Sequence, residues 1–368
     1  MKVTVLAGGV GGARFLLGVR EYVSSVSTAE SDIETVPASE PSSASIPARK
    51  PARIPTSDDV ADANETSTRV PESRASQPTA IVNVGDDTWM HDLRLCPDLD
   101  SCMYTLGGGI DEHRGWGRQD ETWSLKAELA AYGAKPDWFG LGDRDTATHL
   151  IRSQMLRAGY RLSDITEALS KRWSPGVRLL PVTDDRSETY VVVTHPTDGD
   201  KQAIHFQEWW VRYRAQIETH DFVHIGADEA APAPGVLDSI RDADIVLIAP
   251  SNPIVSIAPI LAIPGVRGAL RTTNAPVVGI SPIIGNAPLR GMADVCLRVA
   301  GSEVSSQGVA EYYGARESTG ILDGWLSHPG DTVSVPGIAA LETPIMMTNP
   351  SITAEMVASA CKLVGVQP

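Results

Sequence analysis

The chain has 368 residues, of which 42% are hydrophobic, and a formal net charge of −15 at pH 7. No stretch approaches the roughly 18 consecutive apolar residues of a membrane span, so a membrane is not expected as a partner. Proteins bind duplex nucleic acid mainly through Lys and Arg side chains that contact phosphates, so the negative net charge argues against nucleic acid as a partner. The four cysteines lack C-x-x-C spacing and the chain opens on a strand pattern rather than a signal peptide, which predicts reduced thiols in a cytoplasmic protein.

The first predicted element is a strand that ends in a glycine-rich turn. The apolar run 3–7 leads into the sequence GGVGG at 8–12 and then into a helical pattern over 14–23. Glycines at this junction leave backbone N–H groups uncovered at a helix N-terminus, which suits phosphate. A tight strand-to-helix turn that needs positive φ would show the same sequence. The residues expected to bind the anion are Gly9, Val10, Gly11 and Gly12.

The next segment, 24–77, is dominated by Ser, Thr, Ala, Pro, Glu and Asp. It has few large apolar residues, which predicts a disordered low-complexity insertion. The strand pattern at 79–84 then completes a βαβ unit with two parallel strands. Short apolar runs at 244–249 and 276–280 predict further strands buried on both faces. The predicted fold class is therefore α/β: a Rossmann-like, doubly wound, mostly parallel sheet in one domain over 1–368.

A helical and hairpin subdomain is predicted between these strands, over about 141–225. Apolar spacing indicates helices at 147–158 and 165–169. The alternating segments 190–194 and 203–206 flank a Pro-Thr-Asp-Gly-Asp turn and predict a β-hairpin.

Four aspartates follow the second predicted strand. Ligands bind beyond the carboxyl ends of strands in open α/β sheets, which is where these side chains should lie. Carboxylates beside a phosphate need a cation between them, and hard oxygen ligands suit Mg²⁺. The alternative is that they cap a helix or turn, or are solvated. The predicted metal ligands are Asp86, Asp87, Asp98 and Asp100.

Further polar residues sit at the start of the predicted helix at 147–158. A loop with Asp143, Arg144 and Asp145 can hold a guanidinium between carboxylates, and His149 and Arg152 follow on the first turns. The alternative is a helix cap and a surface ion pair of little energetic weight.

Two later segments carry polar and aromatic side chains that could contact a ligand. Ser251 and Asn252 follow a buried strand and suit a nucleotide base or ribose, although Ser-Asn-Pro is also a common turn sequence. Trp209 and Trp210 could stack on a flat heteroaromatic ligand. They could equally form a half-buried hinge or the interface of a homodimer.

Six motifs in this order resemble the 2-phospho-L-lactate transferase family of coenzyme F420 biosynthesis, and within it the actinobacterial phosphoenolpyruvate transferases. The resemblance covers nearly the whole chain apart from the insertion. The motifs lie at 8–12, 96–100, 141–149, 205–207, 249–253 and 281–285.

The resemblance implies an Mg²⁺-dependent transfer of the phosphoenolpyruvate moiety from enolpyruvyl-diphospho-5'-guanosine to the deazaflavin Fo, giving dehydro coenzyme F420-0 and GMP. A phospholactate transferase that uses lactyl-diphospho-guanosine is the alternative within the family. A non-catalytic, nucleotide-sugar-binding regulatory protein is the alternative of another class. A nicotinamide-dependent oxidoreductase is disfavoured because the glycine spacing is not G-x-G-x-x-G.

Residue roles follow from this reaction, since phosphoryl transfer is catalysed mainly by positioning and charge stabilisation. The expected catalytic residues are Asp87, Asp100 and Arg144, with Asp100 serving either the metal or the ribityl chain of Fo. The glycine turn would hold the diphosphate. The other expected substrate-binding residues are Asp98, Asp143, His149, Trp209, Ser251 and Asn252.

Overall fold

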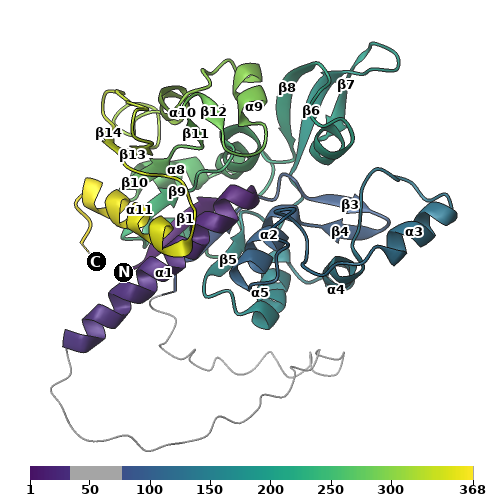
Figure 1. Ribbon diagram of the computed structural model, residues 1–368, viewed down its shortest axis with the longest axis horizontal. Helices are drawn as coiled ribbons and strands as arrows, with labels where there is room; N and C mark the ends of the chain where they lie inside the picture. The colour runs from purple at the N-terminus through teal and green to yellow at the C-terminus, as the bar shows by residue number, and fades with distance from the viewer. Residues whose placement is uncertain (34–76, 368) are drawn as a thin grey trace, which may run out of the picture.

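The computed structural model describes residues 1–33 and 77–367 (Figure 1). Its centre is a seven-stranded sheet in which every neighbouring pair is parallel, in the order β14-β13-β10-β9-β1-β2-β5. This confirms the predicted α/β class with a Rossmann-like, doubly wound sheet. The strands are β1 (Val3–Ala7), β2 (Thr79–Val82), β5 (Arg178–Pro181), β9 (Ile245–Ile248), β10 (Val277–Ile280), β13 (Gly324–Ser327) and β14 (Ala339–Glu342).

The central strands are buried along their whole length, which explains their continuous apolar sequences. β1 lies between β2 and β9, and the strand order runs outward in opposite directions on its two sides. Such a reversal opens a crevice beyond the carboxyl ends of the strands, where doubly wound proteins bind their ligands. The glycine turn therefore sits at the position that favours a ligand site.

Helix α1 (Gly9–Ile33) starts inside the glycine turn and packs against α2 (Pro97–Leu106) and α11 (Pro350–Leu363) (Figure 1). An added Cβ at Gly18 would lie 2.4 Å from Thr353 Cγ2, so this glycine allows α11 to approach. The helix continues past the predicted end at 23, so residues 24–33 are helical rather than disordered. Val26 packs on the core and helps to hold this extension. The remainder of the predicted insertion, 34–76, lies outside the described residues.

The range 141–225 holds α4 (Asp143–Arg157), α5 (Leu162–Trp173) and a three-stranded antiparallel sheet in the order β7-β6-β8. The predicted hairpin corresponds to β6 (Glu188–Thr194) and β7 (Lys201–His205). Strand β8 (Thr219–Ile225) was not predicted, because half-buried residues on both faces blur its alternation. The range also supplies β5 to the main sheet.

The remaining elements connect these parts. A short hairpin, β3 and β4, follows β2 and leads into α2. Among the described residues no single helix is long and apolar enough to span a membrane, and one bent pair, Pro253–Ala262 with Val266–Thr272, meets the criteria of length and composition. The other elements are β3 (Thr88–Met90), β4 (Leu93–Leu95), α3 (Ser124–Ala131), α6 (Val236–Arg241), α7 (Ala258–Ala262), α8 (Val266–Thr272), β11 (Ile283–Ile284), β12 (Ala287–Pro288), α9 (Ala293–Val299), α10 (Ser306–Tyr313) and the π-helical turns Glu208–Arg212 and Pro253–Ile257.

Candidate active site

The glycine turn is held by the loop that follows β9. Gly9 adopts a φ of +62°, in the left-handed region that favours glycine. An added Cβ at Gly11 would lie 2.6 Å from the carbonyl oxygen of Pro250. Ser251 Oγ donates to the carbonyl of Gly8 at 2.7 Å and accepts from its N–H at 3.2 Å. The glycines are therefore required by backbone conformation and by the close approach of two sheet-edge loops.

This contact predicts a specific cost for Gly11→Ala. The new methyl group would collide with backbone that cannot rotate away, so we expect a loss of about 1–3 kcal/mol in the free energy of unfolding. The matched control is Gly268→Ala in α8, where an added Cβ has nothing within 4 Å and should be neutral or stabilising. Urea unfolding of both variants measures the difference. Equal midpoints would mean that the turn adapts and that its glycines are not needed for packing.

Asp86 and Asp98 form a pair of buried carboxylates beside this turn. Asn83, just after β2, donates from Nδ2 to Asp86 Oδ1 at 3.1 Å and to Asp98 Oδ2 at 2.9 Å. An added Cβ at Gly8 would lie 2.7 Å from Asp98 Oδ2. Burial, and then the charge of Asp98, raises the pKa of Asp86 well above its usual range, and burial raises that of Asp98. Within residues 1–33 and 77–367 neither carboxylate is ion-paired.

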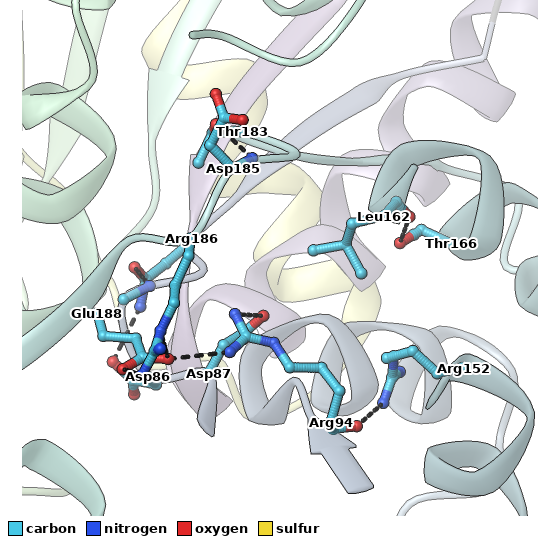
Figure 2. Close-up of polar contacts among 12 residues, drawn as sticks. Asp86, Asp87, Arg94, Arg152, Leu162, Thr166, Thr183, Asp185, Arg186 and Glu188 are labelled. Carbon is cyan, nitrogen blue, oxygen red and sulfur yellow. Dashed lines mark hydrogen bonds and ion pairs between the residues drawn. The ribbon is translucent and has the colours of Figure 1, made fainter. Parts of the chain in front are cut away.

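Asp87 lies in a second, arginine-containing group (Figure 2). It is fully buried, and its Oδ2 contacts Arg94 Nη2 at 3.3 Å. The other guanidinium nitrogen, Arg94 Nη1, contacts Glu188 Oε1 at 3.0 Å. Burial raises the pKa of Asp87 to about 7 although the charge of Arg94 opposes the shift. Asp87 Oδ1 is buried and has no hydrogen-bond partner among the described residues.

Asp100 belongs to a third group, centred on Arg152. Arg152 Nη1 donates to Asp100 Oδ2 at 3.0 Å, and Nη2 contacts Oδ1. His149 lies between two carboxylates, with Nδ1 3.6 Å from Asp100 Oδ2 and Nε2 3.4 Å from Asp145 Oδ2. Tyr104 donates to Asp145 at 2.6 Å. Asp100, Asp145 and His149 are close enough to share a metal ion, but Arg152 already engages both oxygens of Asp100.

Asp143 and Arg144 are directed away from these carboxylates. Asp143 accepts from Thr122 Oγ1 at 2.6 Å and from the N–H of Leu125 at 2.8 Å, at the start of α3. The Thr122 bond is the main cause of its lowered pKa. Arg144 is exposed, and its Nη1 lies 3.8 Å from Asp120 Oδ2. These side chains stabilise the segment before α3, and their predicted roles toward substrate stay predictions.

Trp209 and Asn252 have internal partners. Trp209 is fully buried, with Phe206 and Phe222 against its ring, so in place of a wall for a ligand it forms part of the core. Asn252 Oδ1 accepts from the N–H groups of Ile254 and Val255 and so caps its own loop. The predicted homodimer stays a prediction.

Sequence reasoning missed Asn83, Arg94 and Glu188 as members of the site. Arg94 and Glu188 are 94 residues apart, so no local pattern connects them. The sequence did offer one indication, because Arg94 stands between Leu93 and Leu95. An arginine in a short apolar strand is buried only where acidic residues pair with its charge.

Known proteins resemble this chain over most of its length. The sequence model of the family described as 2-phospho-L-lactate transferase CofD matches residues 63–336. A phosphoenolpyruvate transferase from Mycolicibacterium smegmatis is 57% identical over 366 residues, covering 100% of this chain and 99% of that protein. One from Nocardia farcinica is 57% identical over 367 residues, covering 100% and 96%.

A crystal structure of a UPF0052 family member from Bacillus halodurans aligns with a TM-score of 0.52 at 16% identity, covering 97% of this chain and 98% of that one. This similarity concerns the fold alone. The fold is that of a Rossmann-like α/β protein, with the candidate site at the carboxyl edge of its sheet. The chain belongs to the 2-phospho-L-lactate transferase CofD family and is a transferase of coenzyme F420 biosynthesis.

Proposed function

We propose that the chain transfers the phosphoenolpyruvate moiety from enolpyruvyl-diphospho-5'-guanosine to Fo, giving dehydro coenzyme F420-0 and GMP. Full-length relatives named phosphoenolpyruvate transferase, at 57% and 58% identity, support this choice of donor. The observation that carries the proposal is the glycine turn at the strand-order reversal, in contact with a buried carboxylate pair that has no cationic partner in the described part of the chain.

We assign Mg²⁺ to Asp86 and Asp98 within this proposal. A diphosphate on the glycine turn would face Asp98, which is unfavourable without a cation between them. Burial raises the pKa of both carboxylates, the charge of Asp98 raises that of Asp86 further, and together they supply the hard oxygen atoms that Mg²⁺ prefers. When bound, the ion would neutralise charge on the phosphate oxygens and the leaving group. Asp100 fits this role less well because Arg152 balances its charge.

Asp87 would serve the acceptor, whereas both oxygens of Asp100 are engaged by Arg152 and its predicted catalytic role stays a prediction. The terminal ribityl hydroxyl of Fo donates to Asp87 Oδ1, the buried oxygen that lacks a partner in the described structure. The hydroxyl oxygen of Fo forms a bond to the phosphorus that bears the enolpyruvyl group. The bond from that phosphorus to the GMP oxygen breaks, and GMP leaves with the electron pair. The hydroxyl proton passes to Asp87. The N–H groups of Val10 and Gly11 would hold the diphosphate, because that of Gly9 is hydrogen-bonded to Asp98 and that of Gly12 donates to the carbonyl of Gly8.

Incubation of the protein with Fo, Mg²⁺ and each guanosine-activated donor in turn tests the reaction. Mass spectrometry should detect the phosphodiester of Fo with the enolpyruvyl donor, together with GMP. Product from the lactyl donor alone would favour the phospholactate transferase, which the family description supports. Unchanged Fo with tightly bound nucleotide would favour a regulatory binding protein.

Removal of divalent metal tests the Mg²⁺ assignment separately. With EDTA in excess we expect GMP release to fall at least about 100-fold, because the buried carboxylates would then repel the diphosphate. Added Mg²⁺ should restore the rate. Full activity in EDTA would rule out a metal-dependent site.

A further inference from the structure

Arg94 joins two acids that come from different parts of the fold. It lies on β4, its partner Asp87 follows β2, and its partner Glu188 begins β6 of the antiparallel sheet (Figure 2). The three side chains are 7%, 0% and 4% exposed. Each carboxylate receives one guanidinium nitrogen, so the planar group has a fixed orientation between them.

The backbone of Arg94 is fixed as well. Its N–H donates to Ser153 Oγ at 2.7 Å, and its carbonyl accepts from Arg152 Nη1 at 3.3 Å. Glu188 is held in turn by Arg186, whose Nε and Nη2 both donate to it at 2.8 Å. Helix α4 therefore anchors the main chain of Arg94, and β6 anchors its side chain.

Within the described part of the chain, this arrangement engages only one of the two buried carboxylate oxygens of Asp87. Arg94 contacts Oδ2, and Oδ1 has no partner among the described residues. The carbonyl of Asp87 lies 3.2 Å from His205 Nε2, which limits movement of its backbone. Rotation of the carboxylate would break the Arg94 contact inside a buried site, where an unpaired charge is costly.

We propose that Arg94, oriented by Glu188, is a positioning residue that presents Asp87 Oδ1 to the acceptor hydroxyl of the transfer reaction. The inference rests on the proposed function and adds a residue to it. Arg94 acts through Asp87 and contacts neither the donor nor the acceptor. Its loss should therefore lower kcat while the KM for the guanosine-activated donor stays within about twofold.

The test is a double-mutant cycle of Arg94→Met with Asp87→Asn, measured as GMP release. Arg94→Met alone is expected to lower kcat about 100-fold, because a displaced carboxylate loses its alignment with the hydroxyl. In the Asp87→Asn background the same change should have less than about a twofold effect, because its target is already gone. Arg161→Met, which removes an exposed ion pair with Asp164, is the matched control and should leave kcat unchanged.

Arg94→Lys keeps the experiment decisive if the methionine variant does not fold. Lysine retains the charge but not the planar fork, so we expect about a tenfold loss of kcat, again with unchanged donor KM and again absent in the Asp87→Asn background. Additive losses in the cycle, or a rise in donor KM equal to the fall in kcat/KM, would overturn the positioning role. Absence of Fo phosphodiester with the wild-type protein would instead overturn the proposed function itself.

Discussion

Arg152→Met is expected to lower the free energy of unfolding by about 3–5 kcal/mol, the largest stability effect that we anticipate from a single substitution in this site. Arg152 is 2% exposed and engages both oxygens of Asp100. Its removal would leave a buried carboxylate without compensation, and the carbonyl of Arg94 would lose a donor. Urea unfolding followed by circular dichroism gives the number.

Two comparisons separate this mechanism from the general effect of replacing an arginine. Arg161→Met removes an exposed pair and should cost less than about 1 kcal/mol. The double variant Arg152→Met with Asp100→Asn should recover part of the loss, because no unpaired charge then remains buried. A loss below about 1 kcal/mol for Arg152→Met, or no recovery in the double variant, would mean that the pair contributes little to folding.

Asp98→Asn is expected to have the largest effect on activity, a fall in kcat of about 1,000-fold or more, together with loss of the response to Mg²⁺. The amide keeps the size of the side chain and an oxygen that can accept from Asn83. It removes the negative charge that would hold the cation opposite the diphosphate. GMP release over a range of Mg²⁺ concentrations measures both effects, with Glu355→Gln on the exposed face of α11 as the control.

The same variant should not be less stable at neutral pH. Burial raises the pKa of Asp98 above its usual range, so the folded protein binds this proton more tightly than the unfolded chain does. The stabilisation is complete below about pH 4, where the unfolded carboxyl is also protonated, and is lost as the pH rises through the raised pKa. The melting temperature of Asp98→Asn relative to wild type should therefore increase with pH across this window. A constant difference would contradict the pKa shift.

The sequence could predict the parts of the fold and site that rest on local pattern. Continuous apolar runs identified β9 and β10, and the glycines after β1 identified a turn that closely approaching backbone requires. Of the four aspartates after β2, Asp86 and Asp98 share Asn83 as a hydrogen-bond donor, and Asp98 lies beside the glycine turn, as expected where parallel strands end on the same side.

The remaining features depend on contacts distant in sequence. Among the described residues, Asp86 and Asp98 have no arginine partner whereas Asp87 has one, and nothing in the local sequence distinguishes them. Trp209 is covered by Phe222, which lies on the strand that was not predicted. Asp143, at the start of α4, is of a residue type that suits a binding site. Its carboxylate nevertheless accepts from the backbone at the N-terminus of α3. Charge and burial at such positions are set by the tertiary fold.

A crystal structure with Fo, GDP and Mn²⁺ in place of Mg²⁺ would test most directly whether the metal and the substrates bind at the carboxyl edge of the sheet. The anomalous signal of Mn²⁺ is expected between Asp86 and Asp98, beside the glycine turn, with the ribityl chain of Fo against Asp87. Mn²⁺ bound instead by Asp100, Asp145 and His149, or Fo bound away from this edge, would contradict the proposed site.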